Sequence, residues 1–202
     1  EERRVDHFYP RNDMRLLSSL KIGLTTVLLS AAILPTQAQE KKNQGQVLDY
    51  EPWSPEAVES FYRIPVQHDG RVKPMGTVAY FEMLAMRSKT NMTFNSGDES
   101  VKIDSTEWLM DMMFRTELAK GQPVIVVDDG DAVVNIGAKA HRKRDYYSYD
   151  ELKAGRAKLA DMGARYAQKG DKADALEAQV VLLAQRVNRF EYMASTLNFA
   201  IP

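Results

Sequence analysis

The chain of 202 residues contains no cysteine and only three histidines. Without cysteine it cannot form disulfides, thiolate metal sites or a cysteine nucleophile, so thiol–disulfide chemistry is excluded. The histidines, His7, His68 and His141, have no second histidine or cysteine nearby at metal-ligand spacing, so we do not expect a transition-metal site built by this chain alone. We expect His68 and His141 to be exposed, and a haem-binding or catalytic role is the alternative for each.

Sequence motifs of common catalytic and nucleotide-binding sites are also missing. There is no Gly-x-Ser-x-Gly, Ser-x-x-Lys or His-Glu-x-x-His, and no Walker loop. Residues 70–73 hold too few glycines to cradle a phosphate. The acidic turn at residues 128–131 could hold calcium, but it lacks the closing glutamate of a calcium loop, which favours a solvated turn. We therefore assign no catalytic residue and no metal ligand, and a secreted hydrolase is disfavoured.

Neither sign of charge dominates the chain, which has 27 basic and 28 acidic residues and a formal net charge of -1. A chain with this balance has no overall field that would attract nucleic acid. The basic run at residues 142–144 lies beside Tyr146 and Tyr147, a combination that can bind single strands by stacking and charge neutralisation. In a near-neutral chain we favour a solvated edge strand for this run and expect no nucleic-acid partner.

One mainly apolar run without charged residues stands out, at residues 22–34, after Arg15 and Lys21 and before small residues that end at Ala38. This pattern predicts a signal peptide over residues 14–38, and a retained N-terminal anchor is the alternative. The run is shorter than the roughly 20 residues that a spanning helix needs. Residues 1–13 are expected to be an upstream extension, and residues 39–48 a polar linker.

Short elements are predicted for residues 49–147. Pro55 after Ser54 predicts a helix start, and the Asp-Gly pair between residues 64–67 and 71–74 predicts a β-hairpin. Thr77 is expected to cap a helix over residues 78–87, with Leu84 on its apolar side. Residues 91–102 are expected to be a loop.

Two further elements are predicted before residue 148. Asp104 and Glu107 have the spacing of a capping box, which predicts a helix through Trp108. The β-branched runs at residues 123–127 and 132–136 predict a second hairpin.

Residues 148–202 are predicted to form two helices that break at residues 170–171. Ser148 and Glu151 have capping-box spacing at the start of the first. The second carries apolar residues at alternating spacings of four and three, the pattern of a packed helical pair: Leu176, Val180, Leu183, Val187, Phe190, Ala194 and Leu197. We expect this seam to pack on the first helix, and a partner helix is the alternative. The fold class is therefore α+β, with a small helix-hairpin domain followed by a long antiparallel helical hairpin.

The order of these pieces resembles a known family. The stretch "IPVQHDGRVKPMGTVAYFEML", then "STEWLMDMMF", then "PVIVVDDGDAVVNIGAKAHRKRDYYSYDEL" is similar to the extracytoplasmic region of System II cytochrome c biogenesis proteins, the haem-handling membrane proteins of the CcsA and ResB type. The resemblance runs from about Trp53 to the end of the chain. The positions that match the family's motifs are Gly70, Arg71, Lys73, Pro74, Thr77, Glu107, Trp108, Tyr147, Ser148 and Leu152.

This resemblance implies a scaffold or docking domain that supports haem attachment to apocytochrome c. The family's haem-handling core is a multi-helix membrane domain with a tryptophan-rich loop and flanking histidines, whereas the tryptophans here are Trp53 and Trp108 alone. No haem-ligand role is therefore transferred to His68 or His141, no cofactor is expected in this part, and heme is implied for the complete protein.

The implied partners are the membrane domain of the same or a partner biogenesis protein and, as a further candidate, apocytochrome c. The implied location is extracytoplasmic (periplasmic) and attached to the inner membrane, with residues 148–202 leading toward a membrane region. The alternative is a secreted interaction domain unrelated to haem.

Overall fold

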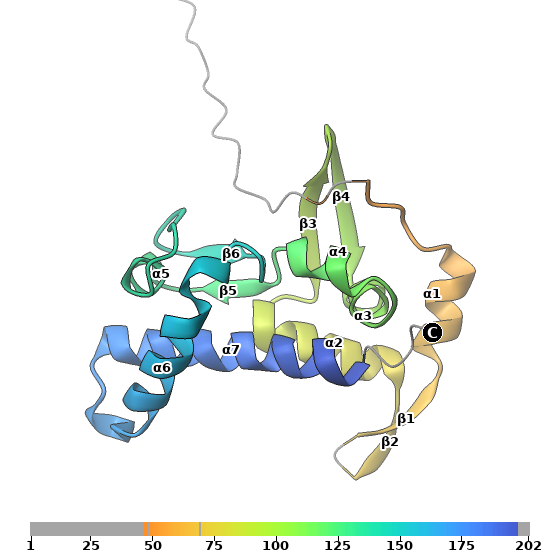
Figure 1. Cartoon of the computed structure of the whole chain (residues 1–202). Coiled ribbons are helices and arrows are strands. Elements are labelled where there is room, and N and C mark those ends of the chain that lie inside the picture. Colours follow the sequence, from red (N-terminus) through yellow and green to blue (C-terminus); the bar gives the residue numbers. More distant parts are fainter. Residues whose placement is uncertain (1–46, 48, 69, 198–202) are drawn as a thin grey trace, which may run out of the picture. The chain divides into compact units, whose positions relative to one another are not determined.

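The structure, a computed structural model, describes residue 47, residues 49–68 and residues 70–197 (Figure 1). The expected extension at 1–13, the signal peptide or anchor at 14–38 and most of the linker at 39–48 lie outside these residues. Val47 is buried, and its amide donates to the carbonyl of Asn95, so packing already begins inside the predicted linker. Among the described residues, no helix is both long and apolar enough to cross a bilayer.

The predicted α+β class is confirmed. In the described part of the chain the strands form three separate two-stranded antiparallel sheets, β1–β2, β3–β4 and β5–β6. The strands are β1 Pro65–His68, β2 Arg71–Pro74, β3 Asn91–Ser96, β4 Glu99–Asp104, β5 Ile125–Val127 and β6 Asp145–Tyr147. The helices are α1 Pro55–Tyr62, α2 Met75–Arg87, α3 Ser105–Phe114, α4 Thr116–Gly121, α5 Gly130–Asn135, α6 Arg156–Ala167 and α7 Ala175–Leu197, with short 3-10 turns η1 Lys153–Gly155 and η2 Gly170–Lys172.

The first hairpin forms as predicted. Strand β1 pairs with β2 in a register that sets Val66 opposite Lys73 and His68 opposite Arg71. Gly70 has φ of 73°, a conformation that glycine adopts without the steric cost that a Cβ would add. The first helix is also confirmed, because Pro55 begins α1 and the Ser54 side chain accepts the amide of Ala57.

The predicted loop at residues 91–102 is wrong, because this segment forms the second hairpin, β3–β4. Met92, Phe94 and Ile103 are at most 1% exposed and lie on one face of the hairpin. Burying these side chains on the helices supplies the stability that an isolated two-stranded sheet lacks. Gly97 takes positive φ at the turn, as Gly70 does in the first hairpin.

Each hairpin leads directly into a helix, but the two helix starts differ. At α3 the predicted capping box is present: Asp104 accepts the amides of Thr106 and Glu107, and the Glu107 carboxylate accepts the amide of Asp104. At α2 the prediction for Thr77 is wrong, because the helix begins at Met75 and Pro74 is its N-cap without a side-chain hydrogen bond. The backbone of Pro74 is extended, with the φ that its ring fixes, as is usual for an N-cap residue. The helix therefore begins directly after it, at Met75, and Thr77 already lies within the first turn.

The predicted hairpin between residues 123–127 and 132–136 is also wrong. Residues of the second run form α5, where the Asp129 side chain accepts the amide of Asp131 and caps the helix. Ala132 and Val133 are then buried on one side of this short helix. Strand β5 instead pairs with β6, with Ile125 opposite Tyr147.

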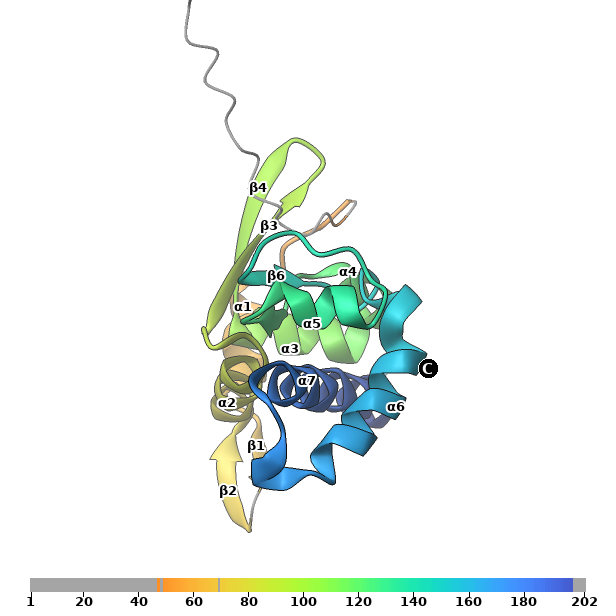
Figure 2. The same ribbon diagram turned by 90° about the vertical axis from the view of Figure 1, so that its left-hand side faces the viewer.

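The two C-terminal helices pack against each other, as predicted. Val180, Leu183, Val187 and Phe190 of the seam on α7 are buried, as are Leu159 and Met162 on α6. Helix α7 also packs against α2, α3, α5 and β5. Figure 2 looks nearly along α7 and shows α2 and α6 on either side of it. Residues 49–147 and 148–197 therefore share one hydrophobic core, and α7 is its central element.

Candidate functional site

Most of the residues singled out in the second and third motifs are structural. Trp108, Tyr147 and Leu152 are fully buried, and Ser148 is nearly so. Glu107 belongs to the capping box of α3. The predicted pair at the start of the C-terminal region also forms: the Ser148 amide donates to Glu151, and the Glu151 amide donates to the Ser148 hydroxyl. These residues hold the core and the ends of its elements, and the side chains of Trp108, Tyr147, Ser148 and Leu152 are buried away from any partner.

A buried carboxylate ties the start of the described chain to α3. The Asp111 side chain is fully buried, and it accepts hydrogen bonds from the indole of Trp53 at 2.8 Å and from the amide of Gln122 at 2.6 Å. Burial raises the pKa of the Asp111 carboxyl above its ordinary value, although these hydrogen bonds favour the charged form. The guanidinium of Arg115 stacks on the Trp53 ring at 3.8 Å. Every contact of this network is internal, so its role is to fix residues 50–53.

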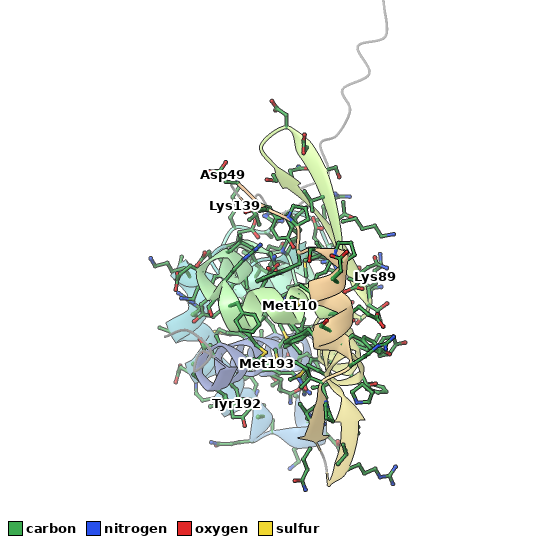
Figure 3. The ribbon with its side chains drawn as sticks, turned by 90° about the vertical axis from the view of Figure 1, so that its right-hand side faces the viewer. Asp49, Lys89, Met110, Lys139, Tyr192 and Met193 are labelled. Carbon is green, nitrogen blue, oxygen red and sulfur yellow. The ribbon has the colours of Figure 1, made fainter. Side chains whose placement is uncertain are left out.

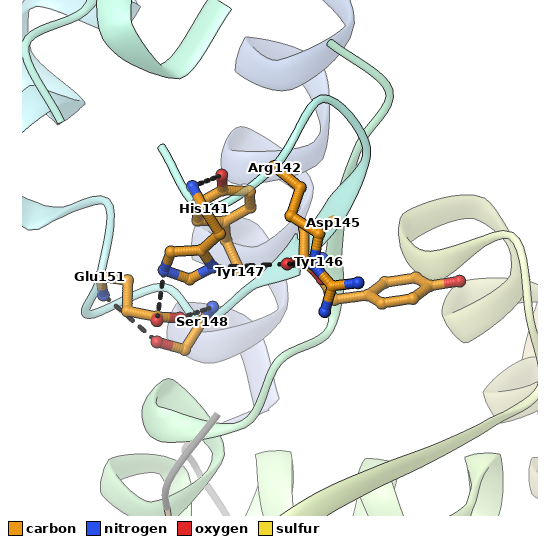
Figure 4. A network of polar contacts seen from close by, with 7 residues as sticks. All are labelled: His141, Arg142, Asp145, Tyr146, Tyr147, Ser148 and Glu151. Atoms are coloured by element: carbon orange, nitrogen blue, oxygen red, sulfur yellow. Dashed lines mark hydrogen bonds and ion pairs between the residues drawn. The ribbon is translucent and has the colours of Figure 1, made fainter. Parts of the chain in front are cut away.

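His141 is the centre of a second polar cluster (Figure 4). Its imidazole is stacked on the Tyr147 ring, 4.5 Å between ring centroids, and its side chain is 11% exposed, so the prediction of an exposed histidine is wrong. Its Nε2 lies 3.3 Å from a Glu151 carboxylate oxygen, and its Nδ1 lies 3.8 Å from an oxygen of Asp145. The Tyr147 hydroxyl accepts the backbone amide of His141. The cluster therefore fastens the loop that precedes β6.

The chemistry open to the His141 cluster is limited. Arg142 lies 3.4 Å from the same Asp145 carboxylate that faces the imidazole. The Ser148 hydroxyl accepts the Glu151 amide, and the His141 imidazole faces the two carboxylates rather than this hydroxyl. Among the described residues, no group of three or more histidine or acidic side chains is arranged to hold a metal ion. The contacts of the imidazole with two carboxylates hold the loop in place. The arrangement is not that of a catalytic triad.

The remaining motif residues lie at the surface, on the first hairpin. Hairpin β1–β2 projects away from the helices in two views turned by 90° (Figures 1 and 2). Val72 is 73% exposed between exposed Arg71 and half-buried Lys73. Because side chains alternate along a strand, Arg71 and Lys73 point to one face and Val72 to the other. The hairpin therefore presents basic side chains on one face and an aliphatic side chain on the other.

Helix α2 continues this surface with an apolar stripe. Tyr80 is 45% exposed and Phe81 55% exposed, their rings meet edge to face at 5.3 Å, and Leu84 lies one turn further on and is also exposed. Leu84 was expected on the apolar side of this helix together with Ala79, Met83 and Met86; those three are buried, whereas Leu84 is exposed. The stripe was missed because α2 carries apolar residues on both sides, so periodicity alone does not separate the face that packs on the core from the face that stays exposed.

Gly76 lets the stripe extend to α1. A Cβ at this position would lie 1.8 Å from the Tyr62 ring, so the glycine is required for the tyrosine to pack this closely against the first turn of α2. Tyr62 is 43% exposed and Ile64 is equally exposed beside it. We call the exposed side chains of this region the hairpin surface, and its members are Tyr62, Ile64, Arg71, Val72, Lys73, Tyr80, Phe81 and Leu84.

A cavity of about 320 Å³ lies where the hairpin surface meets α7. Its lining combines basic and apolar groups, namely His68, Lys73, Val78, Phe81, Glu82 and Arg189. Glu82 is largely buried and accepts two hydrogen bonds from the Arg189 guanidinium, one of them at 2.8 Å. His68 was expected to be exposed, but its side chain is only 35% exposed and its Nε2 lies 3.8 Å from Glu82. The cavity thus has an acidic group inside and basic groups around it.

Comparison with known proteins adds no identification to this geometry. No protein-family model matches the chain, and no curated protein matches it. The description of this site therefore rests on the residues of this chain alone. Of the motif positions, Arg71 and Lys73 lie on the hairpin surface, whereas Tyr62, Tyr80 and Phe81 belong to it without having been singled out in the sequence.

Proposed function

We propose that this chain is a docking domain, without catalytic residues of its own, of a System II cytochrome c biogenesis protein. In this role it works outside the cytoplasm and supports haem attachment to apocytochrome c. The proposal combines two separate observations: the order of the three sequence motifs, and the hairpin surface that carries part of the first motif. Its partner is the membrane domain of the same or a partner biogenesis protein.

The exposed apolar side chains around the first motif carry the proposal. Six of the large apolar side chains that are exposed in the described residues fall within residues 62–84, namely Tyr62, Ile64, Val72, Tyr80, Phe81 and Leu84. Exposed apolar side chains that gather in one region, rather than being scattered singly, are typical of interaction surfaces. A docking role accounts for this exposure, whereas a catalytic role would require groups that the surface does not hold.

The test is cytochrome c maturation in cells that carry variants of the full-length protein. Arg71→Ala and the pair Tyr80→Ser with Phe81→Ser are expected to reduce maturation severalfold. Because these side chains are exposed, each variant should keep its melting temperature within a few degrees, which corresponds to about 0.5 kcal/mol per substitution.

Val134→Ser is the matched control, since Val134 is 59% exposed on α5, far from the hairpin in Figure 1. This control should mature cytochrome c normally. If the hairpin variants mature cytochrome c as well as the control does, the surface has no docking role in this process. If they lose stability and maturation in parallel, the motif is structural only.

A haem titration tests the expected absence of a ligand site. His68 faces Glu82, and His141 is stacked on Tyr147, so neither imidazole is presented as an open axial ligand. We expect no sharp Soret shift when haem is added to the purified chain. A stoichiometric shift that His68→Ala or His141→Ala abolishes would replace the docking proposal with a haem site.

A further inference from the structure

Hairpin β3–β4 has an outer edge on strand β4, and it projects beyond the helices in both views (Figures 1 and 2). The turn at residues 97–98 has two residues, so Ser96 and Glu99 beside it exchange hydrogen bonds with each other. Hydrogen-bonded and open pairs then alternate along an antiparallel hairpin. The main-chain groups of Ser100 and Lys102 therefore point away from β3.

Contacts of the opposite strand agree with this alternation. Asn95 lies opposite Ser100, and its carbonyl accepts the amide of Val47, which lies outside the hairpin. The carbonyl of Asn91, four residues earlier on β3, accepts a hydrogen bond from the Arg87 guanidinium. Every second residue of β3 thus faces outward, and the residues opposite them on β4 face outward as well.

Two residues of β4 remain available for pairing. The outward amide of Asp104 already donates to the Glu107 carboxylate. Ser100 and Lys102 are exposed, and their outward amides and carbonyls make no hydrogen bond among the described residues. Strand β4 also has no proline and no bulge, two devices that block an open edge. The edge therefore offers two amides and two carbonyls, on residues roughly 7 Å apart, to one further strand.

The surroundings of this edge are acidic. Residues 91–104 contain four charged side chains, all exposed: the acidic Asp98, Glu99 and Asp104 and the basic Lys102. Residues 49–51, whose Tyr50 amide donates to the Ser96 hydroxyl, add two exposed carboxylates. Lys89 precedes β3, but its ammonium lies over the Tyr146 ring. A strand with basic side chains is therefore attracted to this edge, although Lys102 lies on the edge itself.

We propose that the outer edge of β4 binds an extended, basic segment of a partner polypeptide, which adds to hairpin β3–β4 as a third strand. The main chain of this segment pairs with Ser100 and Lys102, and its basic side chains lie near the acidic end of the hairpin. A second copy of this chain is a poorer occupant, because two acidic hairpins repel each other. The inference goes beyond the proposed function, because no residue of the hairpin surface takes part in it.

The test is a titration of the full chain with a synthetic ten-residue peptide that alternates lysine with threonine. Amide hydrogen exchange followed by NMR reports strand addition directly. In the free chain the amides of Val101 and Ile103 should be protected, whereas those of Ser100 and Lys102 should exchange fast. Saturating peptide should slow exchange at the latter two by on the order of tenfold. A peptide with glutamate in place of lysine should bind severalfold more weakly, and added salt should weaken binding of the lysine peptide.

Proline variants test which edge is used. Ser100→Pro removes an outward amide and no bond to β3, so the hairpin should still form. It should weaken peptide binding by on the order of tenfold, because a peptide carbonyl loses its donor and meets the proline ring. Thr93→Pro is the matched control, since it removes an outward amide from β3 instead. This control should bind the peptide within about twofold of the wild type.

Charge variants test the same edge without changing its backbone. Asp98→Asn with Glu99→Gln should weaken binding of the lysine peptide severalfold. Asp131→Asn with Asp171→Asn removes the same charge from exposed positions elsewhere and should leave binding within about twofold of the wild type.

Three results would overturn the inference. The first is that the lysine peptide does not slow exchange at Ser100 and Lys102. The second is that either control variant loses as much binding as the variant it is matched to. The third is that the same two amides become protected in the free chain as its concentration rises, which would assign the edge to a second copy.

Discussion

The two hairpins differ in what they bury, although each leads directly into a helix. Hairpin β3–β4 buries Met92, Phe94 and Ile103 and has an exposed acidic end at Asp98 and Glu99. Hairpin β1–β2 has no fully buried residue among those described, and its large apolar side chain Val72 is 73% exposed. The same supersecondary unit is therefore used once to build the core and once to present a surface. The two hairpins share a local motif, so their packing against the rest of the protein determines which one has buried side chains and which one is exposed.

The largest expected effect separates the two hairpins by stability. Phe94 is fully buried and meets the Tyr50 ring at 5.1 Å, so Phe94→Ala should lower the free energy of unfolding by about 3–5 kcal/mol. Val72→Ala should change it by less than about 0.5 kcal/mol. Urea denaturation of both variants measures the difference. If both variants lose a similar amount of unfolding free energy, the Val72 side chain is packed against other residues in solution and the first hairpin is not an exposed surface.

The stability of the region after the second hairpin should depend on pH through a buried carboxyl. Burial raises the pKa of Asp111, on the helix that follows the second hairpin, so the folded state holds its proton more tightly than the unfolded state. Its contribution to stability is therefore present below the pKa of the unfolded chain and is lost as the pH rises through the folded pKa, at up to about 1.4 kcal/mol per pH unit.

Asp111→Asn should remove this contribution and flatten the dependence of the unfolding free energy on pH in that range. It should also lower stability, because an amide nitrogen must then face the indole of Trp53 or the amide of Gln122. Denaturation at a series of pH values measures both effects. An unchanged slope would show that another group titrates.

A smaller effect should be equal in the two hairpins. Gly70 and Gly97 both have positive φ, and a Cβ at either would meet no atom within 4 Å. Gly70→Ala and Gly97→Ala should therefore each cost about 1 kcal/mol, from backbone strain alone. Thermal melting of the two variants measures this cost. A much larger loss at one turn would show that packing, and not backbone conformation, sets the requirement for glycine.

The smallest effects distinguish the two helix starts. Asp104→Ala should cost about 1 kcal/mol, because it removes the acceptor for two amides at the start of α3. Thr77→Ala should cost less than about 0.5 kcal/mol, because α2 has already begun at Met75 and no side-chain cap bond is made there. Melting temperatures of the two variants test this pair. A loss at Thr77 as large as that at Asp104 would restore Thr77 as the cap.

The sequence predicted those elements whose signals are local. The Asp-Gly turn, the capping box at Asp104 and the seam on α7 all depend on neighbouring residues, and all three form. Hairpin β3–β4 was missed because polar residues dominate its composition, although Met92 and Phe94 alternate as in a strand.

Other features could not be read from neighbouring residues. Strand β5 pairs with a partner about 20 residues further on, and only tertiary packing decides this pairing. The hairpin surface had a partial signal in its basic residues, but the exposure of Tyr80 and Phe81 depends on which side of α2 meets α3 and α7.

The pairing of Glu82 with Arg189 has a consequence for the order of folding. The two residues are 107 positions apart, whereas the strand pairs that close both hairpins join residues at most 13 positions apart. Contacts of low sequence separation form faster than distant ones, so we expect the two units to form before α7 docks between them and α6. During synthesis the cavity at the base of the first hairpin stays incomplete until α7 has been made. The surface beside this cavity therefore reaches its final form only in chains that have finished folding, and under the proposed docking role an unfinished chain does not yet present the complete surface to a partner.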